Sequence, residues 1–517
     1  MRIYSFKTLI LTLLVGLFGC GSDDAAVGEC GVTIDFDGSA IRYCPSEENS
    51  SATLNRPQDE FIWQAMNLYY YWQNEVSLLA DDRFASYDEL YGFLNSAGSS
   101  EELYYQDLLS PTDRFSWIVD DYIALENSFQ GISEASFGYD FGLLRESAGS
   151  NNVFGYVRYV VADGPADLAG LKRGDLFNEV NGVQLTEDNF NDALFGQSSY
   201  TLRLAQIEED AVQSTDQTVS LTAVVLTENP VFLSKVINAG GVNVGYLVYN
   251  QFVNNNTTHR ELNSVFDTFK SAGINDLVLD LRYNPGGSVT TTRILGSLIS
   301  GNTTDSDNLG EIVYNEKLSP FFNSPLRFLE SLPIFDENNN VVSEEPLNRL
   351  TNLSRIFILT SGRSASASEL LIVGLDPYLD VTTIGTTTVG KNEGSLTLYD
   401  SKLSLYLDRT NEDINPDHIY AIQPIVSKLA NSEGFTDYSN GLEPNVEVDE
   451  RDYLGDLKAL GDVEEPLLAE ALAIIQGNAR TVRPKVVGEA FEFKSKRQEM
   501  LEKTIIEPQY VPRSSLK

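Results

Sequence analysis

The stretch "SRIFILTSGRSASASELLIVGL", residues 354–375, joins an apolar strand pattern to a serine-rich turn and then to an apolar helical pattern. Ser366 precedes Glu369 by three positions, just before the hydrophobic run, which is the signature of a helix capping box. Most such matches only begin a helix. A serine at a helix N-terminus is also well placed to be a nucleophile, because the free N–H groups there can stabilise an oxyanion.

The same alternation of strand and helix patterns extends over residues 227–480. The pattern "DLVLDLRYNPGGS" (276–288) is a buried strand that runs into a glycine turn, and "DVTTIGTTTVGK" (380–391) is another strand. Strands separated by helices indicate βαβ crossovers, and loops after the carboxyl ends of such strands build functional sites. The turns NPGG, SGRSAS and TVGK each follow a strand. We therefore expect an α/β core with a site formed by these three turns.

Two different patterns precede this core. Apolar residues recur at helical spacing from 56 to 127, which predicts a small helical domain. Residues 128–226 combine strands with glycine-rich turns, and "GPADLAGLKRGDLFNEVNGVQL" (164–185) resembles a PDZ domain. The alternative is a small β domain whose glycines only make turns. The resemblance implies that a loop binds a peptide's C-terminal carboxylate while the peptide adds a strand to the sheet edge. The loop residues are Ser136, Phe137, Gly138 and Tyr139.

The N-terminus has the layout of a secretion signal. Arg2 and Lys7 precede an apolar run that ends at Cys20 and is too short to span a bilayer comfortably. The ending "LFGC" resembles a bacterial lipobox, which implies that Cys20 is lipidated; an ordinary signal peptide is the alternative. We expect a signal peptide over residues 1–19 and a tether over 20–55. The protein would then be an exported bacterial lipoprotein, anchored to a membrane on its periplasmic or cell-surface side.

Composition narrows the partners and cofactors. The 36 basic and 75 acidic residues give a formal net charge of −39, which excludes the basic footprint that nucleic-acid binding needs. Cys30 and Cys44 lie close together and are candidates for a disulfide in an oxidising compartment. The two histidines, His259 and His418, are distant from them in sequence. The sequence therefore predicts no zinc site of the usual ligand types and no other metal or cofactor.

A nucleophilic serine needs an adjacent base. His259 and His418 are not excluded, but neither follows a buried strand into a glycine turn. Lys391 ends such a strand pattern, twenty-five positions after Ser366. An amine accepts a proton only when it is neutral, so the lysine pKa of about 10.4 must fall to roughly 7–8. Apolar burial and the positive end of a helix beginning at Ser366 can both lower it.

These motifs together resemble the carboxyl-terminal processing (tail-specific) serine proteases, over about residues 56–480. The lipoprotein-like N-terminus resembles that of Bacteroidetes members. The resemblance implies a multidomain α/β protein: an N-terminal helical domain, a PDZ-like β-rich domain and a ClpP/crotonase-like α/β catalytic core. It also implies cleavage of protein or peptide substrates near their free C-termini by a Ser–Lys dyad. The implied residues are Ser366 as nucleophile, Lys391 as base, Gly287 and Ala367 as backbone oxyanion donors, and Asp280, Arg282 and Glu369 in supporting positions.

One departure from the family pattern concerns the lysine. Many members carry a glutamine shortly after it that helps to position it, whereas here Ser395 stands at that place with Glu393 nearby. The sequence leaves open which group orients Lys391, what the oligomeric state is, and what the tail at 481–517 does. The alternative function is a non-catalytic peptide- or ligand-binding surface lipoprotein on the same fold. In that case Ser366 caps a helix and Lys391 is a structural cation.

Overall fold

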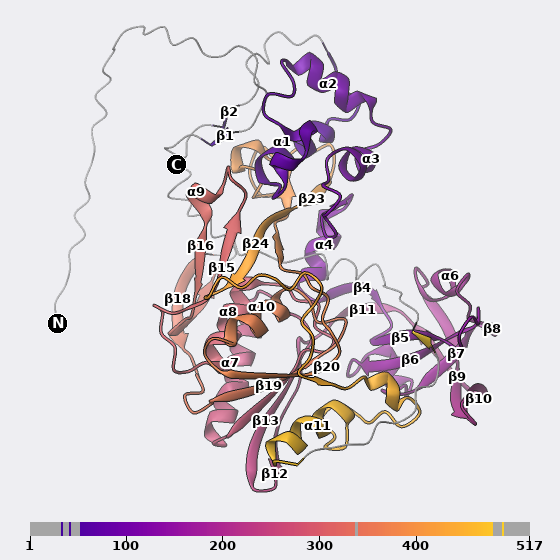
Figure 1. Cartoon of the computed structure of the whole chain (residues 1–517). Coiled ribbons are helices and arrows are strands. Elements are labelled where there is room, and N and C mark those ends of the chain that lie inside the picture. The colour runs from indigo at the N-terminus through magenta and orange to yellow at the C-terminus, as the bar shows by residue number, and fades with distance from the viewer. Residues whose placement is uncertain (1–32, 35–40, 43–51, 337–339, 479–488, 491–517) are drawn as a thin grey trace, which may run out of the picture.

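The computed structural model describes residues 33–34, 41–42, 52–336, 340–478 and 489–490 (Figure 1). The predicted signal peptide, Cys20, Cys30 and Cys44 lie outside the described residues, as does all but two residues of the predicted tail. In Figure 1 the N-terminal helices lie at the top, the PDZ-like sheet at the right, and the large α/β core below and to the left. The predicted multidomain α/β fold class is confirmed.

In the N-terminal region, α2 buries Tyr87, Leu90 and Leu94 on one face, whereas residues 61–69 of α1 are buried on all sides. The side chain of Ser86 caps α2 by accepting a hydrogen bond from Glu89 N at 3.3 Å. Trp63 and Tyr70 of the aromatic stripe are buried in a cluster that also contains Tyr406 and Ile422 of the core. The helical region therefore shares its hydrophobic core with residues of the α/β part of the chain. Its elements are α1 (Gln58–Tyr69), η2 (Gln73–Glu75), η3 (Ser77–Leu79), α2 (Tyr87–Ser96), α3 (Ser100–Glu102), the π-helical turn η4 (Leu103–Asp107), β3 (Trp117–Val119) and α4 (Tyr122–Phe129).

The middle region is an antiparallel sheet with two short helices. Its strand order is β10-β9-β7-β6-β5-β26, so that the last, short strand pairs with the outer edge of β5. A separate two-stranded sheet, β4–β11, joins this region to the core. The elements are β4 (Ile132–Ser136), β5 (Tyr139–Arg145), β6 (Val153–Val160), α5 (Pro165–Leu168), β7 (Leu176–Val180), β8 (Val183–Gln184), α6 (Phe190–Leu194), β9 (Ser199–Glu208), β10 (Ala211–Thr222), β11 (Val224–Thr227) and β26 (Glu489–Ala490).

The core is built on a six-stranded sheet of order β12-β13-β14-β19-β20-β25. β12 and β13 are antiparallel, and the other neighbours are parallel. Leu277 and Leu279 of β14 pack into the cluster that includes α7 and α8, while Val278 packs toward α11, because successive strand residues face opposite sides. The elements are β12 (Val231–Ala239), β13 (Val242–Tyr249), α7 (Asn256–Ser271), β14 (Asp276–Asp280), α8 (Val289–Ile299), β19 (Arg355–Thr360), α10 (Ala367–Leu375), β20 (Asp380–Gly385), β25 (Val446–Glu447), η6 (Glu450–Tyr453) and α11 (Pro466–Ile475).

Smaller sheets surround this core. A four-stranded sheet, β16-β15-β24-β21, packs against α10, and β22-β23-β3 ties the helical region to the core. The elements are β15 (Asn308–Tyr314), α9 (Ser319–Phe322), β16 (Ser324–Arg327), β17 (Ser331–Phe335), β18 (Val341–Pro346), β21 (Glu393–Ser395), β22 (Leu398–Tyr399), η5 (Lys402–Ser404), β23 (Ala421–Gln423) and β24 (Ile425–Asn431); β1 (Thr33–Ile34) and β2 (Ile41–Arg42) form an isolated pair.

Candidate active site

The turns after β14, β19 and β20 meet at one edge of the core sheet. These strands are parallel neighbours, so their carboxyl ends lie side by side. Hydrogen bonds join the turns: Ala365 N donates to Asn284 O at 3.2 Å, Ser364 Oγ donates to Leu281 O at 2.8 Å, and Val389 N donates to Ser364 O at 3.0 Å. The three turns that the sequence singled out therefore form one structure.

Ser366 lies at the N-cap of α10 in a strained backbone conformation, with φ +63° and ψ −114°. A positive φ at a non-glycine residue costs roughly 1–3 kcal/mol and persists only where the surroundings enforce it. Ser366 is buried, and its Oγ has no hydrogen-bond partner among the described residues. A Cβ on Gly286 would lie 2.8 Å from the Ser366 Cβ, so that only glycine permits this close approach.

Glu369 connects the serine to the lysine. One carboxylate oxygen accepts from Ser366 N and Lys391 N, both at 2.8 Å, and the other accepts from Gly390 N at 2.7 Å and from Thr388 Oγ1. Burial raises the pKa of this carboxyl above its usual range, while the four hydrogen bonds oppose that effect. The glutamate half of the predicted capping box is formed, and the same carboxylate fixes the backbone of both candidate dyad residues.

Lys391 is buried in the loop between β20 and β21. The expectation that the strand runs to Lys391 is wrong by six residues, because β20 ends at Gly385, whose φ of +140° turns the chain against Thr360. The Lys391 Nζ lies 5.3 Å from the centre of the Phe115 ring. This ring comes from the N-terminal region, which sequence reasoning had not connected with the site.

The N-terminal region is anchored at the same place by its neighbouring residue. Arg114 donates to Gly390 O at 2.7 Å and to Ser439 O at 2.8 Å, beside the lysine loop. In sequence these residues are only the segment "TDRFSW", and no local motif marks them as part of a site. They join the site only through tertiary contacts, since Arg114 and Gly390 are 276 residues apart in the sequence.

The predicted oxyanion donors lie in adjacent segments of the site. Phe252 holds the glycine strand by donating to Gly286 O at 2.9 Å and accepting from Ser288 N at 2.8 Å. A Cβ on Gly286 would lie 2.9 Å from Ala367 N, which places the glycine pair against the first turn of α10. Within the described part of the chain, neither Gly287 N nor Ala367 N donates to an acceptor. Two backbone donors are thus available beside Ser366 for a developing negative charge.

Asp280 and Arg282 lie in a buried ion network and make no hydrogen bond to Ser366 or Lys391. Arg282 donates to Asp280 at 2.8 Å and to Glu465, at the start of α11, at 2.9 Å.

Arg173 of the PDZ-like region bonds to Glu465 and Glu450. Burial favours the neutral acid, but Arg173 and Arg282 lower the pKa of Glu450 to about 2. The network holds the backbone that leads into the glycine turn, because Arg282 O in turn accepts from Ser361 Oγ.

The predicted carboxylate-binding loop connects β4 to β5. Gly138 has φ +75°, and a Cβ there would lie 3.2 Å from Gly164 and from Pro165. Its N–H donates to Ser136 Oγ at 3.0 Å, so a ligand carboxylate would have to replace Ser136 Oγ as the acceptor or share the N–H with it. The Phe137 ring lies 4.1 Å from that of Tyr200. Tyr139 OH is 2.7 Å from Tyr200 OH.

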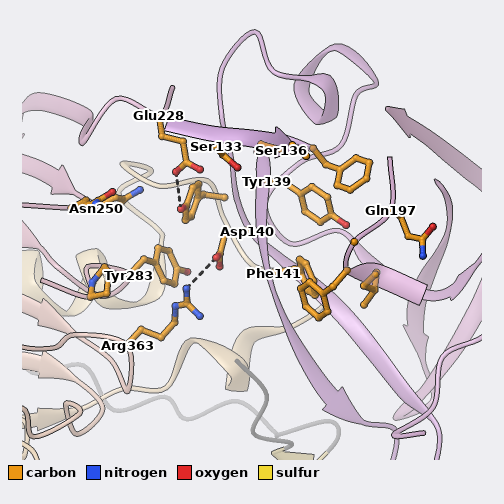
Figure 2. A pocket seen from close by; sticks show the side chains of 18 of the residues that line it. Ser133, Ser136, Tyr139, Asp140, Phe141, Gln197, Glu228, Asn250, Tyr283 and Arg363 are labelled. Carbon is orange, nitrogen blue, oxygen red and sulfur yellow. Dashed lines mark hydrogen bonds and ion pairs between the residues drawn. The ribbon is translucent and has the colours of Figure 1, made fainter. Parts of the chain in front are cut away.

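A pocket of about 400 Å³ separates this loop from the core (Figure 2). One wall carries Tyr139 and Phe141 of β5, and the other carries Tyr283, Pro285 and Arg363. In Figure 2 Asp140 points across the pocket and pairs with Arg363 at 3.1 Å. Because Arg363 and Pro285 belong to the turns that carry Ser366 and Gly287, the pocket reaches from the PDZ-like loop to the edge of the candidate active site.

The histidines are engaged elsewhere. Burial lowers the pKa of His259 to about 4, and its Nε2 lies 2.9 Å from Thr291 Oγ1. His418 Nε2 lies 3.0 Å from Asp400. Neither forms a hydrogen bond to Ser366 Oγ. In the described ranges we find no cluster of three or more potential metal ligands and no helix long and apolar enough to cross a membrane.

Comparison with known families and structures gives matches in the order of the three regions. Residues 57–117 match the peptidase S41 N-terminal domain, 156–195 a PDZ domain, and 243–418 peptidase family S41. The chain is 28% identical over 262 residues to a carboxy-terminal-processing protease of Bartonella bacilliformis, covering 48% of this chain and 51% of the relative. It is 23% identical over 292 residues to the carboxy-terminal processing protease CtpA of Bacillus subtilis, covering 56% and 52%.

The chain thus spans about half the length of the curated relatives it matches. Among solved structures, it resembles a Bacteroides fragilis protein assigned to the S41 proteases, with a TM-score of 0.59 and 24% identity. That match covers 84% of this chain and 99% of the other and concerns the fold alone. The regions identified by the matches coincide with the helical region, the PDZ-like sheet and the core that carries Ser366 and Lys391. Residues 243–418 of the chain therefore match peptidase family S41, behind segments that match the N-terminal domain of the S41 peptidases and a PDZ domain.

Proposed function

We propose that the protein is a serine endopeptidase that uses Ser366 and Lys391 as a dyad and cleaves protein or peptide substrates near their C-termini. The observation that carries this proposal is the position of Glu369, which accepts hydrogen bonds from Ser366 N and Lys391 N on one oxygen. A helix cap alone would not require the carboxylate to bind a lysine loop twenty-two positions away. The unbonded Oγ at a strained N-cap further supports a nucleophile.

The chemical steps follow from these positions. Neutral Lys391 accepts the Ser366 hydroxyl proton while Oγ attacks the scissile carbonyl carbon. The carbonyl oxygen becomes an oxyanion bound by Gly287 N and Ala367 N, each such donor contributing about 3–4 kcal/mol to the transition state. Lys391 then protonates the departing amine, which leaves an acyl-serine. Lys391 accepts a proton from water while the water oxygen attacks the ester carbonyl carbon. As the ester C–O bond breaks, Lys391 returns that proton to Ser366 Oγ and the acid is released.

Lys391 needs a group to orient it in place of the glutamine that many family members carry. We infer that Glu369 fixes its backbone and that the Phe115 ring limits the position of its Nζ. Ser395 occupies the place of that glutamine, and its Oγ donates to Gln423 Oε1 at 3.3 Å. A carboxamide is therefore present next to this position, supplied by β23.

The pocket between the PDZ-like loop and the core suggests how a substrate is held. A tail that adds a strand to β5, with its carboxylate at Ser136–Tyr139, would lie between the PDZ-like region and the core. The wall formed by Pro285 and Arg363 adjoins the candidate active site, so the chain upstream of the tail can extend toward Ser366. This arrangement favours cleavage a short distance before a free C-terminus.

The test is hydrolysis of an unstructured protein with an apolar C-terminal tail. We expect the parent chain to cleave it, Ser366→Ala and Lys391→Ala to lose cleavage, and Lys458→Ala, which changes an exposed lysine paired with Asp456, to retain it. Cleavage that survives Ser366→Ala would contradict the proposal. Absence of cleavage by every form, together with intact binding of the tail, would support the alternative of a binding lipoprotein.

We also propose that Cys20 is lipidated and anchors the exported protein to a membrane. The support is the sequence pattern that ends in "LFGC". Metabolic labelling with an alkyne fatty acid should mark the parent and leave Cys20→Ser unlabelled. Equal labelling of both forms, or of neither, would contradict it.

A further inference from the structure

Arg363 extends from the serine turn into the pocket between the PDZ-like region and the core. Its backbone is fixed, because Arg363 N donates to Ser361 Oγ at 3.2 Å and Ser364 N donates to Ser361 O at 2.9 Å. Ser366 follows three positions later. In Figure 2 the side chain of Arg363 points toward Asp140 of β5, and it is the one basic side chain among the described residues that line the pocket. A cation is thus attached to the same turn as the candidate nucleophile.

The Arg363 guanidinium is incompletely paired. Among the described residues it donates one of its five N–H groups, from Nη2 to Asp140 at 3.1 Å. Its Nε is buried and has no hydrogen-bond partner in the part of the chain that the structure describes. Asp140 is shared, because its other oxygen accepts from Arg158 Nη1 at 3.1 Å. One carboxylate therefore serves two guanidinium groups, and Arg363 does not form the bidentate pair that an arginine can make with a carboxylate.

The pair between Arg363 and Asp140 can be reached from the pocket. Both residues line it, and their side chains remain 17% and 14% exposed. The planar guanidinium fork matches the geometry of a carboxylate. The pocket already contains two acidic side chains, Asp140 and Glu228. A further anion is therefore accepted there most readily by exchange, in which it replaces Asp140 at Arg363.

The loop that is expected to bind a carboxylate ends beside this pair. Ser136 and Tyr139 line the same pocket, and Asp140 follows Tyr139 directly. Consecutive Cα atoms are about 3.8 Å apart, so those of Gly138 and Asp140 are separated by at most about 7.6 Å. Gly138 N–H donates to Ser136 Oγ, and Arg363 donates to Asp140. Two donors suited to a carboxylate thus lie close together, and each donates here to an oxygen of the chain itself.

We propose that Arg363 binds the carboxylate of a substrate tail in place of Asp140, so that the PDZ-like loop and the turn that carries Ser366 recognise the tail's negative charge jointly. This inference rests on the proposed function, because it names the group that binds the anion of the tail. The carboxylate belongs either to the chain terminus or to an acidic side chain near it, since both have the chemistry that Arg363 recognises. An anion held by this turn also fixes how far the end of the tail lies from the nucleophile.

Binding of labelled peptides in the Ser366→Ala background tests the site without hydrolysis. The probes are three fluorescein-labelled ten-residue peptides: one ends in three alanines with a free carboxylate, one is its carboxamide, and one is a carboxamide that ends in aspartate. We expect Arg363→Gln to weaken binding of the free acid at least about tenfold and to change binding of the alanine carboxamide less than about twofold. The matched control is Arg203→Gln, which removes an arginine of the PDZ-like region that pairs with Glu179 and does not line the pocket. We expect this control to bind all three peptides as the parent does.

Asp140→Asn tests the exchange with the opposite sign. It removes the carboxylate that competes for Arg363, so we expect the free acid to bind at least about threefold more tightly. An ion pair with a merely structural role would instead give weaker binding of both alanine peptides. If the carboxamide that ends in aspartate binds like the free acid and depends on Arg363, the site accepts a side-chain carboxylate. If the dependence is confined to the free acid, the site is specific for the chain terminus.

Equal loss of affinity for the free acid and its carboxamide in Arg363→Gln, or no loss for either, would overturn the proposal. Weaker binding of the free acid to Asp140→Asn would also overturn it, as would failure of every form to bind the free acid. Cleavage is measured separately with Ser366 intact. A parent that cleaves tails whose binding does not depend on Arg363 would refute this site alone. A parent that binds the free acid through Arg363 and cleaves nothing would refute the peptidase proposal alone.

Discussion

Replacement of Glu369 by glutamine tests how the dyad is positioned. The carboxylate accepts four hydrogen bonds, two on each oxygen, from Ser366 N, Lys391 N, Gly390 N and Thr388 Oγ1. A carboxamide has one acceptor oxygen. In its less costly orientation it keeps the bonds from Ser366 and Lys391, donates to Thr388, and leaves Gly390 N–H without an acceptor.

The magnitude follows from those changes. A buried N–H that loses its acceptor costs about 1–3 kcal/mol, and each of the two bonds that change from a charged to a neutral acceptor loses about 1 kcal/mol. We therefore expect Glu369→Gln to lower the free energy of unfolding by roughly 3–5 kcal/mol. Because the affected donors carry the nucleophile and the base, we expect kcat/KM to fall at least about a hundredfold, equivalent to roughly 2.7 kcal/mol.

The assay compares cleavage of a tailed substrate with thermal unfolding and with tail binding. The matched control is Glu393→Gln, a second buried carboxylate, which pairs with Lys428 at 2.5 Å. We expect the control to lose stability while kcat/KM stays within about threefold, and tail binding to persist in both variants. If Glu369→Gln cleaves as fast as the parent after a comparable loss of stability, the positioning role is refuted.

Three further changes test other parts of the structure. Gly286→Ala would place a Cβ 2.8 Å from Ser366 Cβ and from Ala365 O, so we expect kcat to fall at least about a hundredfold with tail binding retained; unchanged kcat would exclude the close approach. Phe115→Leu removes the ring beside the Lys391 Nζ, and we expect kcat to fall about tenfold with little change in KM; a change in KM alone would place the ring in substrate binding instead. The folded-state pKa of Glu450 is lowered from 4.5 to about 2, so its ionised form stabilises the fold above pH 4.5 by about 3 kcal/mol and this stabilisation is lost as the pH falls through 2. We expect Glu450→Gln to flatten acid unfolding in that window, and an unchanged acid transition would contradict the role of the network.

The folded-state pKa of Glu369 is raised, whereas that of Glu450 is lowered. The two groups therefore change the free energy of unfolding in opposite directions as the pH rises. Burial raises the folded-state pKa of Glu369, so the folded state binds the proton more tightly than the unfolded state does. The free energy of unfolding therefore falls as the pH rises from the ordinary glutamate pKa through the raised one. Protonation leaves an oxygen able to accept from Ser366 N and Lys391 N, but it removes the charge that strengthens both hydrogen bonds. We therefore expect kcat to fall on acidification at a pH above the ordinary glutamate range.

Local sequence patterns predicted the parts of the site that lie in continuous segments. Ser366 and Ala367 follow a buried strand and begin a helix, and Gly287 follows another strand, so the order of strand, turn and helix was sufficient to place them. Lys391 was found by the same reasoning, although its strand ends at Gly385. A threonine-rich pattern does not show where two glycines with positive φ turn the backbone.

The parts that sequence reasoning missed depend on long-range contacts. Phe115 and Arg114 belong to a helical region that gave no sign of touching the lysine loop. Asp280 and Arg282 were recognised as polar positions, but their partner Glu465 is 183 residues from Arg282. A buried charge network can be closed only by residues that the fold brings together, and a single sequence does not reveal those pairs.

Other expectations stay predictions. The domain limits at 56–127, 128–226 and 227–480, the role of the Ser136–Tyr139 loop and the catalytic roles of individual residues await experiment. The lipidation of Cys20 and the membrane location concern a segment outside the described residues.

Labelling with a fluorophosphonate followed by peptide mapping tests the central claim most directly. We predict a single adduct on Ser366 of the parent, formed at least about a hundredfold more slowly in Lys391→Ala, while both proteins keep the same tail affinity and thermal unfolding. An adduct on another serine, or equal labelling rates in the parent and Lys391→Ala, would contradict a Ser366 nucleophile activated by Lys391.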